Sequence, residues 1–569
     1  MPSPQDEKDL QTLRISDFSA GIVTFSRGVL EGGNYFPLYP ASAPAGSASF
    51  AVRCYYMPNV GLVPFPTYKP VQTNSIAAGA NALSLSLCNM MCLDGAGTGD
   101  ATVDHIVSSW ISSSGVIPGG TGTFTILRMA TTNGTVGTGT QVYSSTQSTY
   151  QGFVYYPMMD IGEFQSAGTY ARCVITTDPF AASPGAWVTV RAWNSAADST
   201  SGALASPPSS IPRIFYHAER MGVWQTSDSV TTDGFTANDS DQLNVSTTPF
   251  TPTPFTESGL YFPEMGTIIG TWGSISTGEL FVVYNQGGGV VIYGDMLAPS
   301  SALKLPGVVG TGFVLGKAAS TPAGMIYATD FDGAYAWNGD NVATKISTNV
   351  PDDQLYRKNP NIRILGNAEM YSSNVAWGQL VMFPGNWVYD TLTSAWWQSE
   401  DPTVLDFQVN AASSNTGRYF YTSPALATAA IGSGVSVTIY QYDKTLPATT
   451  WTWISNPIVT GASDALISLQ KVEICASNVD SVAATITITP TVPPGQAAYP
   501  GVDPVAFPNN PQPMTFTIPA NTNGWRGSLR FGYTDYNIEL RVDAAGTNIA
   551  PILHELSPSY TIIRIAGVQ

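Results

Sequence analysis

The stretch Glu279-Leu-Phe-Val-Val-Tyr-Asn-Gln-Gly-Gly-Gly-Val-Val-Ile-Tyr293 decides the fold class of this chain of 569 residues. Two short runs of β-branched and aromatic residues flank a glycine-rich turn, which is the pattern of a β-hairpin. A similar strand, Ala334-Tyr-Ala-Trp337, lies between the turn signals Asp332-Gly333 and Asn338-Gly339. The sequence therefore predicts antiparallel strands joined by turns.

Composition extends this prediction to the whole chain. Charged residues make up 11% of the sequence, against roughly 25% in an ordinary soluble domain, so bundles of solvated helices are disfavoured. The chain also has 54 Gly and 41 Pro, together with 13 Trp, 27 Tyr and 23 Phe. This balance favours many short strands separated by turns. We predict an all-β protein.

Net charge, the first residues and the cysteines limit the class of protein. The formal charge of -17 works against attraction to nucleic acid or anionic membranes. Residues 1–10 lack the apolar segment of a signal peptide, and no apolar run approaches the length of a membrane helix. We therefore expect that the chain has no membrane span and that it is synthesised in the cytoplasm. The cysteines are few and odd in number, which predicts free buried thiols: Cys54, Cys88, Cys92, Cys173 and Cys475.

Aromatic residues recur at similar points beside turn signals along the middle of the chain. They are Tyr143, Trp193, Tyr293, Tyr335, Tyr389 and Tyr440, with successive separations of 50, 100, 42, 54 and 51 residues. A unit of about 50 residues fits one four-stranded propeller blade, and the separation of 100 then spans two units. We predict a β-propeller over residues 76–445, with seven blades preferred within a range of six to eight. An irregular double-sheet sandwich is the alternative.

The two ends of the chain differ from this middle part. Residues 1–75 are rich in proline and show little alternation, which predicts an extended N-terminal arm and the first strands. Residues 446–569 alternate cleanly, for example at Thr485–Thr489 and Met514–Ile518, without the turn signals of the repeat. For this region we predict a C-terminal antiparallel β-sandwich.

No catalytic, cofactor-binding or metal-ligating residue is predicted. The histidines His105, His217 and His554 stand alone in β-rich surroundings, and no nucleophile elbow accompanies them. Cys88 and Cys92 have no second pair at zinc-site spacing. We interpret all of these side chains as structural.

Three further patterns resemble known site motifs only in part. Asp330-Phe-Asp-Gly333 starts like a calcium loop but lacks the remaining ligands, so we predict a turn. Residues 330–337 approach the Asp-box of propeller hydrolases such as sialidases without its spacing. The glycine-rich pieces 115–120 and 134–139 lack the Lys-Ser/Thr ending of a phosphate loop. Glycan hydrolysis by two distant carboxylates stays open as an alternative.

Several short stretches together resemble one family. Asp17-Phe-Ser-Ala-Gly-Ile22 is similar to the D-F-S-G-G-I/L opening of bacteriophage tail proteins of the nozzle or tail tubular protein B type, although Ala20 replaces one glycine of the pair. Pro64-Phe-Pro66 stands where that family has an early R-P-G ending. Further similar stretches follow in the family's order: Met57–Leu62, His217–Trp224, Tyr327–Trp337, Trp387–Asp390 and Ala395–Trp397.

The resemblance implies a structural virion protein without enzymatic activity, located in the tail. Such proteins form a ring, commonly a hexamer, with other tail proteins such as the adaptor and the fibres, and the genome leaves through that ring. Because a chain of -17 repels phosphates, we expect DNA to pass without specific binding. We expect residues 1–50 to take part in ring assembly. The alternative is a receptor-binding or tail-fibre-like protein that holds a bacterial surface glycan.

Overall fold

The structure is a computed structural model, and it is all-β, as predicted. The residues that it describes contain strands and one three-residue 3-10 turn, Pro263–Met265, but no α-helix. None of their elements is a long apolar helix able to span a membrane. The described residues are 10–23, 28–29, 35–36, 46–76, 85–93, 103–114, 120–132, 135–136, 139–150, 159–166, 169–178, 189–194, 199–200, 213–224, 242–251, 255–266, 268–273, 279–284, 288–306, 319–320, 325–330, 333–337, 343–350, 375–377, 380–383, 386–400, 409–412, 419–423, 426–428, 435–458, 465–491, 512–536 and 538–565.

In the described residues, seven groups of four antiparallel strands follow one another along the chain. The first three groups are β8 (Leu85–Leu93), β9 (Val103–Ser114), β10 (Gly120–Thr132) and β12 (Thr140–Tyr150); β13 (Met159–Ser166), β14 (Thr169–Asp178), β15 (Thr189–Asn194) and β16 (Ser199–Thr200); and β17 (Arg213–His217), β18 (Arg220–Trp224), β19 (Gln242–Ser246) and β20 (Phe255–Tyr261). Two short strands, β11 (Thr135–Val136) and β35 (Leu426–Thr428), add to the first group.

The remaining groups continue this order. They are β21 (Ile268–Gly273), β22 (Glu279–Tyr284), β23 (Gly288–Asp295) and β24 (Ala298–Pro306); β25 (Ala319–Ser320), β26 (Ile326–Asp330), β27 (Gly333–Trp337) and β28 (Thr344–Lys345); β29 (Val375–Trp377), β30 (Leu380–Met382), β31 (Trp387–Asp390) and β32 (Ala395–Gln398); and β33 (Val409–Ala412), β34 (Tyr419–Ser423), β36 (Val435–Pro447) and β7 (Pro66–Ile76). The last group combines three late strands with β7, which comes from the N-terminal part of the chain.

The aromatic residues of the sequence repeat occupy corresponding strands. Trp193, Tyr293, Tyr335, Tyr389 and Tyr440 all lie in the third strand of their groups. The interval of 100 residues contains the group β17–β20, whose third strand, β19, reads Gln-Leu-Asn-Val-Ser and has no aromatic residue. Tyr143 departs from this rule because it lies in β12, the fourth strand of its group. The spacing near 50 residues therefore corresponds to one four-stranded group.

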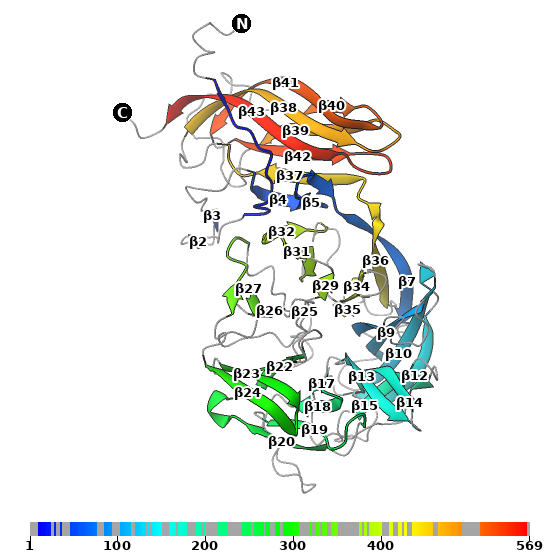
Figure 1. Cartoon of the computed structure of the whole chain (residues 1–569). Coiled ribbons are helices and arrows are strands. Elements are labelled where there is room, and N and C mark those ends of the chain that lie inside the picture. The colour runs from blue at the N-terminus through cyan, green and yellow to red at the C-terminus, as the bar shows by residue number, and fades with distance from the viewer. Residues whose placement is uncertain are drawn as a thin grey trace.

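The first strands of neighbouring groups lie close to one another. Contacts join β8 to β13, β13 to β17, β17 to β21, β25 to β29, β29 to β33, and β33 back to β8. In Figure 1 the groups follow one another in chain order, from β9 and β10 past β14 and β18 to β23, then past β27 to β31.

Residues from both ends of the chain form two further sets of strands. One has the order β41 (Thr522–Tyr536), β38 (Ala465–Asn478), β43 (Ile552–Ile565), β6 (Gly61–Pro64) and β5 (Cys54–Met57), with β1 (Gln11–Thr12) paired to β43. The other set of strands continues the sheet of β29–β32, which has nine strands in all: β32 is followed by β4 (Ala48–Val52), β37 (Thr450–Ser455), β42 (Glu539–Ala545), β39 (Ala484–Thr491) and β40 (Met514–Ile518). We call these two sets of strands the terminal module. Residues 1–75, expected to form an arm and first strands, thus contribute four strands to the terminal module: β1, β4, β5 and β6. The short strands β2 (Gly28–Val29) and β3 (Tyr35–Phe36) pair with each other in a separate sheet.

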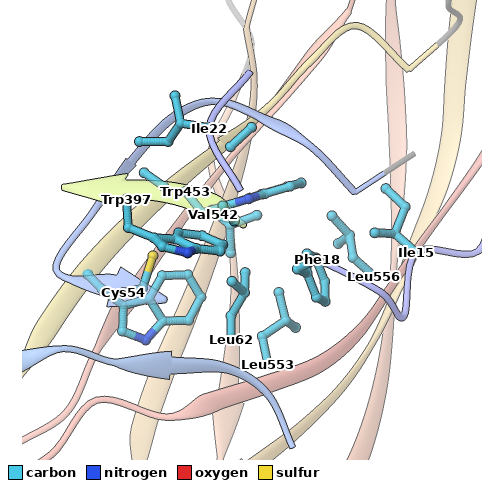
Figure 2. Close-up of a cluster of buried hydrophobic side chains, with 14 of the residues drawn as sticks. Ile15, Phe18, Ile22, Cys54, Leu62, Trp397, Trp453, Val542, Leu553 and Leu556 are labelled. Atoms are coloured by element: carbon cyan, nitrogen blue, oxygen red, sulfur yellow. The ribbon is translucent and has the colours of Figure 1, made fainter. Parts of the chain in front are cut away.

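One hydrophobic cluster holds the terminal module together and reaches the group β29–β32. Phe18 is fully buried and meets Trp453 edge to face, with ring centroids 5.5 Å apart. Figure 2 shows Trp397 of β32 in the same cluster as Cys54, Leu62 and Leu553. Buried aromatic side chains contribute much of the energy of such a core. This core joins the terminal module to β32, beside the parallel pairing of Gln398 with Val52.

Candidate functional site

His217 and His554, the two histidines whose side chains the structure describes, lie in separate sheets. His217, at the end of β17, is buried, and its Nε2 lies 3.2 Å from the carbonyl oxygen of Gly294. Burial lowers the pKa of His217, and the Gly294 carbonyl and Asp295 oppose this shift. His554 lies in β43, in the terminal module. His105 lies in β9, and its side chain is outside the described part of the structure.

His554 contacts the hydroxyl group of Ser477, a pairing that no sequence pattern predicted. Its Nε2 lies 2.5 Å from Oγ of Ser477, and its Nδ1 contacts the carbonyl oxygen of Val60. The partner of Nδ1 is thus a carbonyl rather than the carboxylate of a catalytic triad. Ser477 is 4% exposed, accepts a hydrogen bond from the Gly524 N–H and also contacts Asn523. The arrangement fastens the β5–β6 turn to β38 and β43.

The two cysteines with described side chains are buried free thiols, as predicted for them. They are Cys54 and Cys475. Burial raises the pKa of the Cys54 thiol, which keeps it protonated and unreactive. Cys88 and Cys92 lie in β8 and Cys173 lies in β14, but their side chains are outside the described part. No group of three or more metal-ligating side chains occurs among the described residues.

The partial motifs fall at strand ends or outside the described residues. Asp330 ends β26 and Gly333 begins β27, and the two residues are paired across a hairpin, in agreement with the predicted turn. Residues 331–332 between them are not described. Of the glycine-rich pieces, 115–119, 133–134 and 137–138 are likewise outside the described ranges.

The stretches that carry the family resemblance make specific contacts where sheets join. In the opening stretch, the Ser19 N–H donates to Oδ1 of Asp17 (2.8 Å), and the Ile22 N–H donates to the carbonyl oxygen of Trp396 (2.8 Å). Gly21 has a φ of +61°, and a Cβ on it would lie 2.7 Å from that carbonyl oxygen. Residues 17–22 and 395–397, far apart in sequence, therefore form one joint that requires glycine at position 21.

The stretch Met57–Leu62 forms a second joint of this kind. Asn59 and Gly61 have positive φ angles of 63° and 119° in the turn between β5 and β6. A Cβ on Gly61 would lie 2.3 Å from the carbonyl oxygen of Leu553. Leu62 pairs with Leu553 across the sheet, and both are fully buried. Only glycine allows this turn to approach β43 so closely.

Arg220, in the stretch His217–Trp224, joins two successive groups of strands. Its Nε and Nη2 donate to the carboxylate of Asp295 at 2.5 and 2.7 Å, and its Nη1 donates to the carbonyl oxygen of Ser246 at 2.7 Å. The side chain of Arg220 is only 7% exposed. The hydrogen bonds from Arg220 lower the pKa of Asp295. This bidentate contact fixes the β23–β24 turn against the hairpin β17–β18.

A further ion pair lies where β4, β32 and β37 meet. Nε of Arg53 donates to both carboxylate oxygens of Glu400 at 3.0 and 2.9 Å, and its Nη1 donates to Oγ1 of Thr450. The Glu400 side chain is 1% exposed. Burial and the nearby charge of Glu400 raise the pKa of Tyr68 to about 12.

Four of the stretches of the resemblance, 17–22, 57–62, 217–224 and 395–397, thus hold together segments that are far apart in the chain or lie in successive groups of strands. Comparison with protein-family models and with curated proteins finds no match for this chain. A function is therefore argued from the residues and from these joints.

Proposed function

We propose that the chain is a non-enzymatic structural protein of a bacteriophage tail. In this proposal the seven four-stranded groups are the blades of a β-propeller, and copies of the chain assemble into a ring or nozzle, preferably of six subunits. The genome is ejected through this ring in contact with other tail proteins. The observation that carries the proposal is that four of the resemblance stretches hold together distant segments or successive groups of strands.

The propeller is supported by the contacts between first strands. In a propeller the first strand of each blade lies nearest the axis, so successive first strands should be neighbours. The contacts run from β8 through β13 and β17 to β21, and from β25 through β29 and β33 back to β8. The step from β21 to β25 is not among them, and β25 is only two residues long. Strand β7, from the N-terminal part of the chain, pairs with β36. It would complete the last blade and so close the circle of blades within one chain.

The absence of an enzymatic role is supported by how the candidate side chains are used. His217 contacts a backbone carbonyl, and His554 is held between a buried hydroxyl and another carbonyl. Asp295 and Glu400, two of the carboxylates in the joints, are tied to arginines. Groups held in this way stabilise a scaffold and are poorly placed to exchange protons with a substrate.

The low charge of the chain supports a role in an assembly. A surface rich in Ser, Thr, Asn and Gly can be buried between subunits without the cost of desolvating ionised groups. With 40 acidic and 23 basic residues, a ring of such chains would repel DNA and let it pass.

Imaging of the purified full-length protein tests the proposal. Mass photometry and negative-stain micrographs should show closed rings with a central channel. The protein should not bind a DNA duplex tightly in about 50 mM salt, where electrostatic attraction is strongest. Monomers or elongated trimers that bind host glycans would favour the receptor-binding alternative, and tight, salt-sensitive DNA binding would reject the conduit.

A further inference from the structure

The outer face of the sheet β41-β38-β43 is unusual in this acidic chain because it carries four basic side chains and only two carboxylates. In β38, Val472 and Ile474 point into the core and are 0% and 2% exposed. The alternating residues Lys471, Glu473 and Cys475 therefore lie on the opposite face, where Lys471 and Glu473 are 39% and 49% exposed and Cys475 is covered at 9% exposure.

The cross-strand pairs define the rest of this face. Lys471 is paired with Arg530, Glu473 with Ser528, and Cys475 with Arg526 on β41. On the other side of β38, Cys475 is paired with Glu555 of β43. Paired residues share a face of the sheet, so these side chains lie together. We call them, with Arg14, the β41 face.

The charges of the β41 face are incompletely neutralised. Arg14 and Arg526 both approach one carboxylate, that of Glu555, with nitrogen–oxygen distances of 2.9 and 3.8 Å. Their side chains are 67% and 69% exposed. Lys471 forms an ion pair with Glu473. Arg530 is exposed and forms no ion pair with any other residue that the structure describes. Four cations thus face two carboxylates, in a chain whose net charge is -17.

The same face ends at an open strand edge. β41 is the terminal strand of its sheet and is 15 residues long. One side pairs with β38, and no described strand pairs with the other side. Gly524 and Gly532 on this strand have no atom within 4 Å of an added Cβ, so the space above the sheet at these two positions is open. An exposed edge of this length can accept a further strand through main-chain hydrogen bonds.

We propose that the β41 face binds an acidic extended segment of a second copy of this chain. The open edge supplies main-chain hydrogen bonds, which a polypeptide can match and a DNA duplex cannot. Arg526 and Arg530 lie on the same face of β41 and supply positive charge. This charge would attract acidic side chains at alternate positions of the added strand. The chain itself supplies the partner chemistry, with 40 acidic residues against 23 basic ones.

This contact would be heterologous, because a basic face of one copy meets an acidic segment of the next. Contacts of that type generate rings when the rotation closes. The inference rests on the proposed assembly into a ring and names the surface through which neighbours meet.

Photo-cross-linking of the purified full-length chain tests the inference. A benzoylphenylalanine is placed at Ser528, between the two arginines, and the matched control position is Thr517, an exposed residue of β40 at the edge of the other sheet. An equal mixture of unlabelled and 15N-labelled protein distinguishes links between copies from links within one copy. We expect mixed-isotope links from position 528 to peptides rich in Asp and Glu, and few links from position 517.

Charge reversal provides the second arm. Arg526→Glu with Arg530→Glu should lower the yield of mixed-isotope links at least about tenfold, whereas Arg541→Glu, outside the β41 face, should not. If the thermal unfolding of the Arg526→Glu, Arg530→Glu variant differs from that of the wild type, the variant with Arg526→Gln and Arg530→Gln is used in its place. All comparisons use one salt concentration, because salt screens both the local attraction and the repulsion between whole chains.

Three results would overturn the inference: no mixed-isotope links from position 528, links that survive the loss of both arginines, or links abolished by a 30-base-pair duplex that binds the same arginines. The last result would favour nucleic acid as the partner. Rings that form while position 528 stays unlinked would refute only this inference. Links between copies without closed rings would refute only the proposed function.

Discussion

Arg220 of β18 and Asp295 of β23 join two successive four-stranded groups through a bidentate contact, with nitrogen–oxygen distances of 2.5 and 2.7 Å. The arginine is almost completely buried, whereas 38% of the Asp295 side chain is exposed. A third hydrogen bond from Arg220 reaches the carbonyl oxygen of Ser246 within its own group. The residue is thus a joint between groups whose strands do not pair with each other.

Replacing Arg220 by methionine should destabilise the protein by about 1–3 kcal/mol, because three hydrogen bonds are lost and a buried carbonyl loses its donor. The partial exposure of Asp295 keeps the cost below that of breaking a fully buried pair. Arg541→Met is the matched control. Arg541 also binds a carboxylate through two nitrogens, but the pair is exposed and lies within one strand, so we expect a change below about 0.5 kcal/mol. Urea unfolding measures both, and equal effects would contradict the role of the joint.

Local patterns predicted the strands well, because their signals lie in a few neighbouring residues. The hairpin 279–293 appears as β22 and β23, and the run Met514–Ile518 is β40. The repeat of aromatic residues identified the third strands of several groups, although β19 lacks an aromatic residue and escaped detection.

Pairings between distant segments could not be predicted in the same way. Prolines and weak alternation in residues 1–75 suggested an arm and first strands, but they did not indicate that β5 and β6 belong to the sheet that contains β43. The pair Leu62 and Leu553 is separated by most of the chain. Nothing near Ser477 in the sequence indicates that its hydroxyl meets His554. Such contacts depend on the packing of whole sheets, which no local periodicity encodes.

Gly21→Ala should destabilise the terminal module more than Gly524→Ala. Both glycines have similar left-handed φ angles, +61° and +66°, so both variants carry the conformational cost of about 1–2 kcal/mol. At Gly524 an added Cβ meets nothing within 4 Å, whereas at Gly21 it lies 2.7 Å from the carbonyl oxygen of Trp396. The clash should add about 1–3 kcal/mol. Thermal unfolding of the two variants isolates this difference, and equal midpoints would show that the joint at residue 21 is not tight.

Asp480 should make the terminal module less stable in acid. The backbone N–H and the side chain of Asn548 donate to its carboxylate at 2.7 and 2.8 Å and lower its pKa to about 2. Because this pKa lies below the ordinary value of 3.8, the stabilisation is complete above about pH 4 and is lost as the pH falls towards 2. Asp480→Asn should lower the thermal midpoint at pH 7 and flatten its dependence on pH between 4 and 2.

Asn548→Ala provides the partner control for this prediction. It keeps the carboxylate and the backbone donor but removes one of the hydrogen bonds that lower the pKa of Asp480. The loss of stability between pH 4 and 2 should therefore be smaller than in the wild type and should level off at a higher pH. Thermal midpoints measured from pH 2 to 5 test both variants, and an unchanged profile in both would show that Asp480 does not control the acid response.

Deleting residues 1–50 should unfold the terminal module, and the deletion is therefore not a clean test of an assembly arm. It removes β1, most of β4 and the side chains of Ile15, Phe18 and Ile22, which are 4%, 0% and 2% exposed. Phe18→Ala alone should cost about 3–5 kcal/mol, because it leaves a cavity beside Trp453. Deleting only residues 1–9 spares every described strand and should leave the unfolding transition unchanged. Tryptophan fluorescence reports on the module through Trp451 and Trp453. If the 1–50 deletion kept the wild-type transition, β1, β4 and the buried side chains before residue 50 would not be needed for the terminal module to fold.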